Sequence, residues 1–135
     1  MATMTDPKPA RVPMGVQDAL WLTMDRPNAL MVVDGVMTLG AAPDLDQVHE
    51  VFARAVARFP VFSRRAVRTR GSWVWEDDLD FELGRHVTAV RLPGKADMVA
   101  LQAFLALKRA EPLPRDRPLW AGYLVEKVVL EDGRE

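Results

Sequence analysis

The clearest pattern of apolar positions lies between residues 44 and 60. Apolar residues recur there every three or four positions, which is the spacing of one helix face. Asp44 stands three residues before Gln47, the arrangement of a capping box, and Pro60 follows Phe59. We therefore expect a helix that begins after Asp44 and ends at Phe59.

Two further helices are expected from weaker signals. Gly15 followed by Asp18 is typical of a helix start, and Pro27 limits this helix to about two turns. Asp97 is expected to cap another helix, which carries apolar residues at helical spacing and ends before Pro112.

Alternating positions predict strands in the middle of the chain. Residues 64–76 alternate on either side of Gly71-Ser72, which predicts a β-hairpin with its turn at that pair. Another strand is expected from about His86 to Leu92, closed by Pro93-Gly94. Residues 30–39 (LMVVDGVMTL) are β-branched and apolar around Asp34-Gly35, so we expect one strand broken by a bulge or bend.

The last apolar segment, residues 119–130, predicts a long strand that finishes at Asp132-Gly133. Asp-Gly after a strand is typical of a hairpin, yet only two residues follow it, so the second arm is missing. An unpaired strand leaves an open edge, which folded proteins usually cover. We therefore expect the chain to stop within a sheet, at an unfinished hairpin.

Composition restricts the class of protein. The chain has 18 Lys+Arg, 19 Asp+Glu, 49% apolar residues and no cysteine. The absence of cysteine excludes disulfide scaffolds, thiolate zinc sites and cysteine nucleophiles, and a net charge of −1 gives no field that favours nucleic acid. Residues 1–14 contain three prolines and no periodicity, which predicts a flexible lead before one domain over residues 15–135. No signal peptide or transmembrane segment is predicted, so the cytoplasm is the expected location.

The two histidines do not form a recognisable site. His49 falls on the polar face of the expected helix, which favours a solvated surface residue over a catalytic base. His86 begins a strand and has no second ligand at metal spacing, which favours a structural role over a base or a metal ligand. We expect no metal site and no catalytic residue in this chain.

A basic run precedes an acidic run in the middle of the chain. Pairing of basic and acidic strands in one sheet is the favoured interpretation, since exposed charge pairs are common. The alternative is that Arg64, Arg65 and Arg68 contact the phosphates of a coenzyme A nucleotide, which guanidinium geometry suits. Gly-rich phosphate loops and the G-x-S-x-G elbow do not occur.

Several short motifs, in order along the chain, resemble the start of the bacterial wax ester synthase/diacylglycerol acyltransferase family. Residues 13–22 (PMGVQDALWL) resemble its P-[ML]-S-x-x-D-x-x-[FW]-L motif, with Gly15 where the family usually has Ser. Residues 62–65 (FSRR) resemble its F-R-x-R stretch, and Trp75, Phe81 and His86 follow in the family's order. Residues 113–120 (LPRDRPLW) resemble L-D-x-x-x-P-L-W, with a departure at Pro114-Arg115.

The resemblance implies an α/β fold of the chloramphenicol-acetyltransferase type, a mixed sheet with flanking helices, of which this chain is a partial half. It also implies acyl transfer from acyl-CoA, a substrate rather than a cofactor, to diacylglycerol or a long-chain alcohol. The family's H-H-x-x-x-D-G motif, whose second His is the general base, is absent from this sequence. The chain is therefore expected to be inactive alone and to need a C-terminal half or a partner strand.

By the same resemblance, Pro118, Leu119 and Trp120 are expected to shape the wall of an acyl tunnel, although a large aromatic residue there is equally typical of a simple core. Contact with a membrane surface or a lipid droplet is compatible with such substrates. Two alternatives stay open. One is a non-catalytic binding or interaction module that keeps the half-fold, and the other is a condensation-type relative that uses acyl-CoA or a carrier protein.

Overall fold

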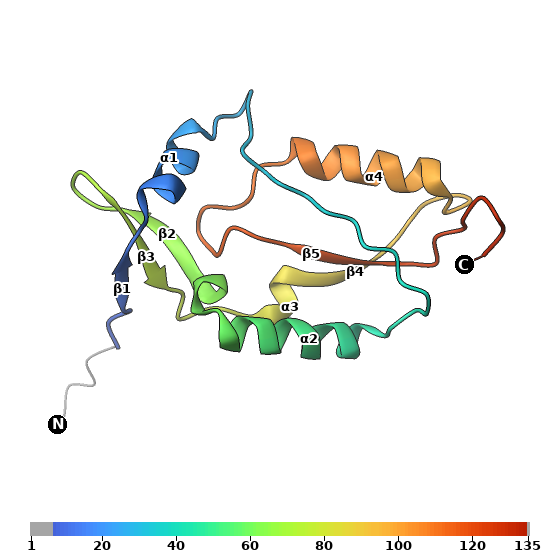
Figure 1. Ribbon diagram of the computed structural model, residues 1–135, viewed down its shortest axis with the longest axis horizontal. Helices are drawn as coiled ribbons and strands as arrows, with labels where there is room; N and C mark the ends of the chain where they lie inside the picture. The colour runs from blue at the N-terminus through green and yellow to red at the C-terminus, as the bar shows by residue number, and fades with distance from the viewer. Residues whose placement is uncertain (1–6, 135) are drawn as a thin grey trace.

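The computed structural model describes residues 7–134 and contains two small sheets with helices around them (Figure 1). The elements in chain order are β1 Arg11–Pro13, α1 Val16–Met24, α2 Leu45–Arg58, η1 Pro60–Ser63, β2 Arg64–Arg68, β3 Trp73–Asp77, α3 Leu83–His86, β4 Val87–Arg91, α4 Met98–Ala110 and β5 Gly122–Glu126.

The first sheet is antiparallel, with strand order β1-β3-β2. The expected hairpin is confirmed: Thr69 N–H donates to Ser72 O at 2.8 Å across the turn, and Gly71 takes a φ of 89°, which only glycine adopts easily. Strand β1 lies inside residues 1–14, which were expected to be a flexible lead. That expectation is wrong for residues 11–13, because β3 offers them an open edge that a search for local periodicity does not detect.

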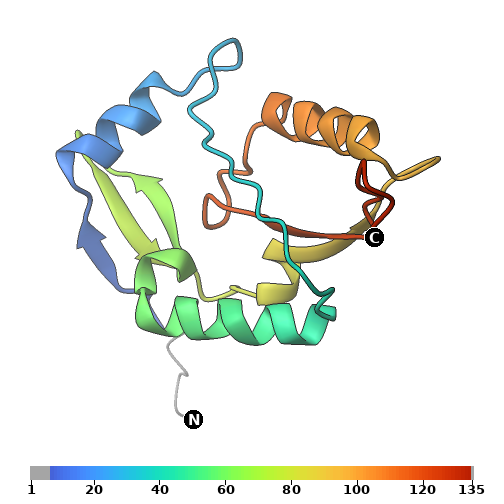
Figure 2. The same cartoon turned by 45° about the vertical axis from the view of Figure 1, so that its right-hand side comes forward.

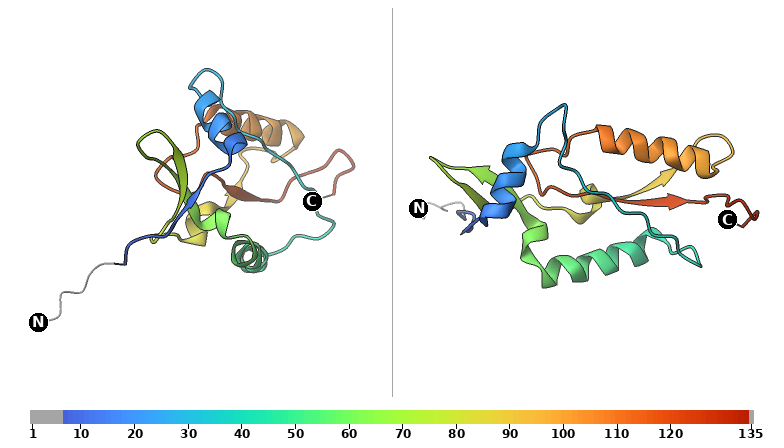
Figure 3. Two further views of the ribbon diagram at one scale, coloured as in Figure 1. Left: turned by 60° about the vertical axis from the view of Figure 1, so that its left-hand side comes forward. Right: turned by 45° about the horizontal axis from the view of Figure 1, so that its top comes forward.

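The second sheet pairs β4 and β5 in parallel, with α4 as the crossover between them. The expectation of an unpaired last strand is therefore corrected, because β5 has a partner that precedes it by a whole helix rather than by a hairpin turn. The strand is also shorter than residues 119–130, since Lys127 adopts a left-handed φ of 54° and takes the chain out of the ladder. In the right-hand view of Figure 3, α4 and α2 lie on opposite sides of these two strands.

All three long helices begin where the sequence predicts. Gln47 N–H donates to Asp44 Oδ1 at 2.8 Å and the Gln47 side chain accepts from Asp44 N–H at 3.0 Å, which completes the expected capping box of α2. The carboxylate of Asp97 accepts from Ala100 N–H at 3.0 Å and caps α4. Gly15 is the N-cap of α1.

The strand expected over residues 30–39 is absent. The segment runs from α1 to α2 as an extended trace (Figure 1), and within residues 7–134 no hydrogen bond joins the backbone of residues 32–39 to another group. Val33 is 81% exposed and Met37 is 83% exposed. The residues have the apolar, β-branched character of a strand, but no neighbouring strand within residues 7–134 supplies hydrogen-bond partners for their backbone N–H and C=O groups.

Few side chains in the described part of the chain are buried, and these are spread over both sheets and α4. Val87 is 1% exposed and Pro118 is also enclosed. The chain exposes 10,419 Å² in total, whereas a compact monomer of 15.1 kDa exposes about 7,100 Å². The fold is therefore open, with well over 2,000 Å² more surface than a protein of this mass needs. No helix in the described part of the chain has the length and apolarity to cross a bilayer.

Candidate functional site

A half-open hollow lies beside α1. In Figure 2, α1 crosses one end of the antiparallel sheet. The volume of the hollow is about 180 Å³. Four structural pieces meet there: α1, the segment after it, β3 and the loop before β5. The lining residues are Asp18, Trp21, Leu22, Asp25, Met31, Val32, Trp75, Leu113, Arg115 and Leu119. Seven of these ten are apolar, so the hollow suits a hydrocarbon group.

A single carboxylate holds the polar rim of this hollow together. Asp25, the C-cap of α1, accepts a hydrogen bond from Met31 N–H at 2.7 Å through Oδ1. Its Oδ2 pairs with Arg115 at 2.6 Å. Asp25 thereby connects the start of the extended segment and the loop before β5 to the end of α1. Asp18, on the same face of α1, is the second acidic residue that lines the hollow.

Residues Pro118, Leu119 and Trp120 form a tight turn at the wall of the hollow. Trp120 N–H donates to Pro118 O at 2.9 Å, which closes a three-residue γ-turn with Leu119 at its centre. Pro118 is enclosed, whereas Leu119 is half-buried and lines the hollow. Of the three residues expected to shape an acyl tunnel, Leu119 lines the hollow, whereas Pro118 and Trp120 are not among its lining residues.

Trp120 is held by aromatic rings from three elements. Its indole stacks on Phe52 of α2 at 5.7 Å and on His86 at 4.7 Å, and Phe62 of η1 meets it edge-on at 6.0 Å. The indole N–H donates to Phe62 O at 2.8 Å. We call these four residues the aromatic cluster. It fixes the Trp120 end of the turn against α2 and β4.

Both histidines are engaged with backbone carbonyls. His86 Nδ1 donates to Trp120 O at 2.9 Å, and His86 is only 4% exposed, which agrees with the structural role favoured from the sequence. His49 Nε2 donates to Val87 O at 2.8 Å. The expectation of a solvated His49 is wrong, because the ring turns toward β4 rather than lying on the outer face of α2. In the described residues, no hydrogen bond joins either ring to a carboxylate.

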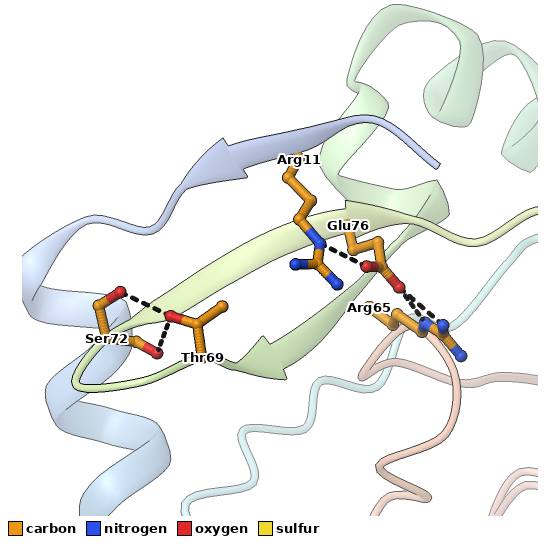
Figure 4. A network of polar contacts seen from close by, with 5 residues as sticks. All are labelled: Arg11, Arg65, Thr69, Ser72 and Glu76. Atoms are coloured by element: carbon orange, nitrogen blue, oxygen red, sulfur yellow. Dashed lines mark hydrogen bonds and ion pairs between the residues drawn. The ribbon is translucent and has the colours of Figure 1, made fainter. Parts of the chain in front are cut away.

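The charge runs pair across the hairpin, which confirms the favoured interpretation. Arg65 and Arg11 reach the same carboxylate, that of Glu76, each at 2.7 Å (Figure 4). Glu76 is 2% exposed. The hydrogen bonds from Arg65 and then Arg11 lower the pKa of Glu76 below its usual 4.5, against the opposing effect of burial.

The other two candidate arginines for a coenzyme A nucleotide lie on the same strand, β2. Arg64 pairs with Asp77 at 2.8 Å. Arg68 stands over the ring of Trp73, with its guanidinium carbon 5.7 Å from the ring centroid. In residues 7–134 no three His, Asp or Glu side chains come close enough to hold a metal ion.

Sequence reasoning missed the hollow, although the chain carries a signal for it. Asp18, Trp21, Leu22 and Asp25 stand at the spacing of one helix face. Such a helix face, with a carboxylate at each end and two apolar residues between them, indicates an apolar surface with a polar rim. Trp75 could not be found in this way, because its place depends on the position of α1 over the sheet.

A family model described as the wax ester synthase/diacylglycerol acyltransferase catalytic domain matches residues 14–134 of the chain. A protein of Mycobacterium bovis and one of Mycobacterium tuberculosis, both named as diacylglycerol O-acyltransferases, are each 32% identical to it over 124 residues. The match covers 85% of this chain and 24% of each relative. The chain therefore spans about a quarter of the length of these curated relatives.

A solved structure has the same fold over most of the chain. It is the wax ester synthase/diacylglycerol acyltransferase from Marinobacter aquaeolei VT8, with a TM-score of 0.59 and 22% identity. The similarity covers 87% of this chain and 31% of that one. The expected mixed α/β fold class is confirmed, with the strands divided between an antiparallel and a parallel sheet.

Proposed function

The chain belongs to the wax ester synthase/diacylglycerol acyltransferase family, and we propose that it supplies the N-terminal part of an acyl-CoA-dependent O-acyltransferase that is inactive alone. Diacylglycerol or a long-chain alcohol is the proposed acceptor. The catalytic base and the remaining wall of the active site come from a C-terminal half or a partner strand.

The observation that carries this proposal is the hollow lined by Leu119. A dry apolar cavity of roughly 150 Å³ accommodates benzene, so 180 Å³ accommodates about six carbons of a hydrocarbon chain. Trp21, Trp75 and Leu119 offer it apolar surface, while Asp25 and Arg115 lie at the rim. We assign the hollow to part of the acyl or alcohol chain, with the reacting group outside it.

The proposed reaction needs a group that this chain does not offer. The acceptor oxygen attacks the thioester carbon, the C–S bond breaks, and the hydroxyl proton ends on the thiol of free coenzyme A. A base must remove that proton during the attack. His86 is only 4% exposed, neither His49 nor His86 lines the hollow, and the sequence has no H-H-x-x-x-D-G motif. These observations support inactivity of the isolated chain.

Arg64, Arg65 and Arg68 remain candidate contacts for the coenzyme A phosphates. Arg64 and Arg65 already pair with carboxylates, so Arg68 is the strongest of the three. A guanidinium beside an indole ring also suits a nucleotide, because it can hold a phosphate while the ring stacks on a base. Peripheral contact with a membrane or a lipid droplet is the proposed source of the apolar substrates.

The test has a binding arm and a turnover arm. The purified chain is titrated with cis-parinaric acid, a fluorescent fatty acid, and assayed for acyl-CoA consumption with hexadecanol and with a diacylglycerol. We expect micromolar binding without turnover. Leu119→Lys should weaken binding at least tenfold, whereas Leu79→Lys, at a residue 60% exposed and outside the hollow, should not. Turnover above a protein-free control contradicts the inactivity, and equal binding by both variants contradicts the site.

The second candidate is a non-catalytic interaction module that keeps the half-fold. The exposed apolar side chains favour it, because Val16, Val33 and Met37 are each more than 80% exposed. An extended segment with unpaired backbone groups, such as residues 32–39, is suited to strand addition. A chain that binds neither cis-parinaric acid nor acyl-CoA but remains folded would favour the module over the acyltransferase part.

A further inference from the structure

We propose that His86 is a positioning residue that sets one wall of the hollow by holding the Pro118–Trp120 turn. The proposal rests on the assignment of the hollow to an acyl or alcohol chain. His86 does not line the hollow; Leu119 does. The effect of His86 on ligand binding is therefore transmitted through Trp120.

The His86 ring is itself firmly held. It sits at the junction of α3 and β4 and is 4% exposed. Its ring centroid is 5.2 Å from that of Phe81 and 4.7 Å from that of Trp120. The next residue, Val87, is 1% exposed and pairs with Gly122 in the parallel ladder. A ring placed in this way offers its Nδ1–H in one direction only.

The Nδ1–H of His86 points to the backbone of the Pro118–Trp120 turn. His86 Nδ1 donates to Trp120 O at 2.9 Å, while Trp120 N–H donates to Pro118 O at 2.9 Å. Both polar groups of the Trp120 backbone are thus fixed, one by His86 and one by the turn itself. Leu119 is the centre of the turn, so its side chain direction into the hollow follows from the placement of Pro118 and Trp120.

The imidazole combines two properties that other side chains offer singly. Its plane stacks on the indole at an angle of 23°, and its N–H supplies the donor to the carbonyl. A phenylalanine retains a ring but leaves the carbonyl without that donor, which is costly in a buried site. An asparagine retains a donor near the Nδ1 position but gives up the ring.

The experiment compares variants of His86 with a matched variant of the other histidine. His86→Ala, His86→Asn and His86→Phe are measured beside His49→Gln, because His49 also donates to a carbonyl but lies outside the hollow. Three readouts are taken: the dissociation constant of cis-parinaric acid, the urea unfolding midpoint, and the methyl resonances of Leu119 in a selectively labelled chain.

We expect His86→Ala to weaken cis-parinaric acid binding about tenfold and to shift the Leu119 methyl resonances. His86→Asn should recover at least threefold of that loss, since it restores the donor, whereas His86→Phe should recover less. His49→Gln should keep binding within twofold even if it lowers the unfolding midpoint. Binding that follows the unfolding midpoint across all four variants would indicate a structural role only and overturns the proposal.

The proposal and the proposed function fail in different ways. If the wild-type chain does not bind cis-parinaric acid, the function assigned to the hollow is wrong, and the methyl resonances then decide the role of His86. Leu119 resonances that shift in His86→Ala but not in His49→Gln support the positioning role, and unshifted resonances overturn it. If His86→Ala does not fold, the same comparison is made with His86→Asn and His86→Phe.

Discussion

The aromatic cluster and residues 30–39 are both strongly apolar, yet the cluster packs ring against ring, whereas the segment contributes only Met31 and Val32 to the hollow. Trp120 meets rings from α2, η1 and the α3–β4 junction, and its N–H has an acceptor. Residues 30–39 have a similar share of apolar side chains but leave Val33 and Met37 more than 80% exposed. An apolar pattern leads to burial only where polar backbone groups also find partners.

The largest effect is expected at the centre of the cluster. Trp120→Ala should destabilise the chain by about 3 kcal/mol, because it removes stacking on two rings and leaves a cavity between α2 and β4. Urea unfolding followed by circular dichroism measures this. Trp120→Phe, which keeps a ring and loses the N–H donor, should cost less than half as much. Equal costs for the two variants would show that the indole hydrogen bond outweighs the stacking.

A smaller effect is expected at the buried carboxylate. Glu76→Gln should cost about 1–2 kcal/mol at pH 7, because a charge-assisted acceptor for two arginines is replaced by a neutral one. The folded pKa of Glu76 is lowered, so its contribution is complete above the usual 4.5 and is lost as the pH falls through the folded pKa. The unfolding midpoints of the wild-type chain and of Glu76→Gln, measured at pH 7, 5, 4 and 3, should therefore converge only below pH 4.5. A constant difference down to pH 3 contradicts the assignment.

A still smaller effect is expected in the exposed segment. Met37→Lys should change the unfolding free energy by less than about 0.5 kcal/mol, since the side chain is already 83% exposed. The same change should reduce self-association, measured by light scattering at increasing concentration, because it places a charge in an open apolar run. If Met37→Lys lowered the unfolding free energy by as much as Trp120→Ala, the segment would be packed in solution.

The smallest effect is expected at the ion pair between the segment and α4. Arg109 donates two hydrogen bonds to Asp34, each at 2.8 Å, and lowers its pKa. Both groups face solvent, where such pairs contribute little and salt screens them. Asp34→Asn should leave the urea midpoint unchanged at low and at high salt. A salt-dependent difference would show that this pair holds the segment in place.

Local features of the fold could be predicted from the sequence because nearby residues determine them. The Asp44–Gln47 box, the Asp97 cap and the turn at Gly71-Ser72 are each complete within a few residues. The pairing of β5 with β4 could not be predicted, because its partner lies across a helix. The prediction of a strand over residues 30–39 was wrong for the opposite reason, since its own residues favour a strand but residues 7–134 provide no partner strand for it.

The residues of the candidate site also fall into those that the sequence could identify and those that only contacts between distant elements revealed. Family resemblance singled out Pro118, Leu119 and Trp120 but did not predict the turn that they form. The pairing of the basic and acidic runs followed from their order on two strands. The roles of His49 and Trp75 depended on which elements face each other in space. Contacts between distant elements carry no local pattern, so the hollow emerged only from the three-dimensional arrangement.

The crossover between β4 and β5 sets the order in which the hollow assembles as the chain folds. Arg64 and Asp77, paired in the hairpin, stand 13 positions apart, whereas Arg91 and Glu126 of the parallel ladder stand 35 apart. Hairpins form in about 1–10 μs, and contacts between more distant positions follow later because more chain entropy must be lost. Leu119 lies three positions before Gly122, the first residue of β5, so the wall of the hollow forms in the late step. If the hollow binds a hydrocarbon chain as proposed, the rate at which a refolding chain gains affinity for a fatty acid should report the pairing of β4 with β5, and the hairpin should form before that affinity appears.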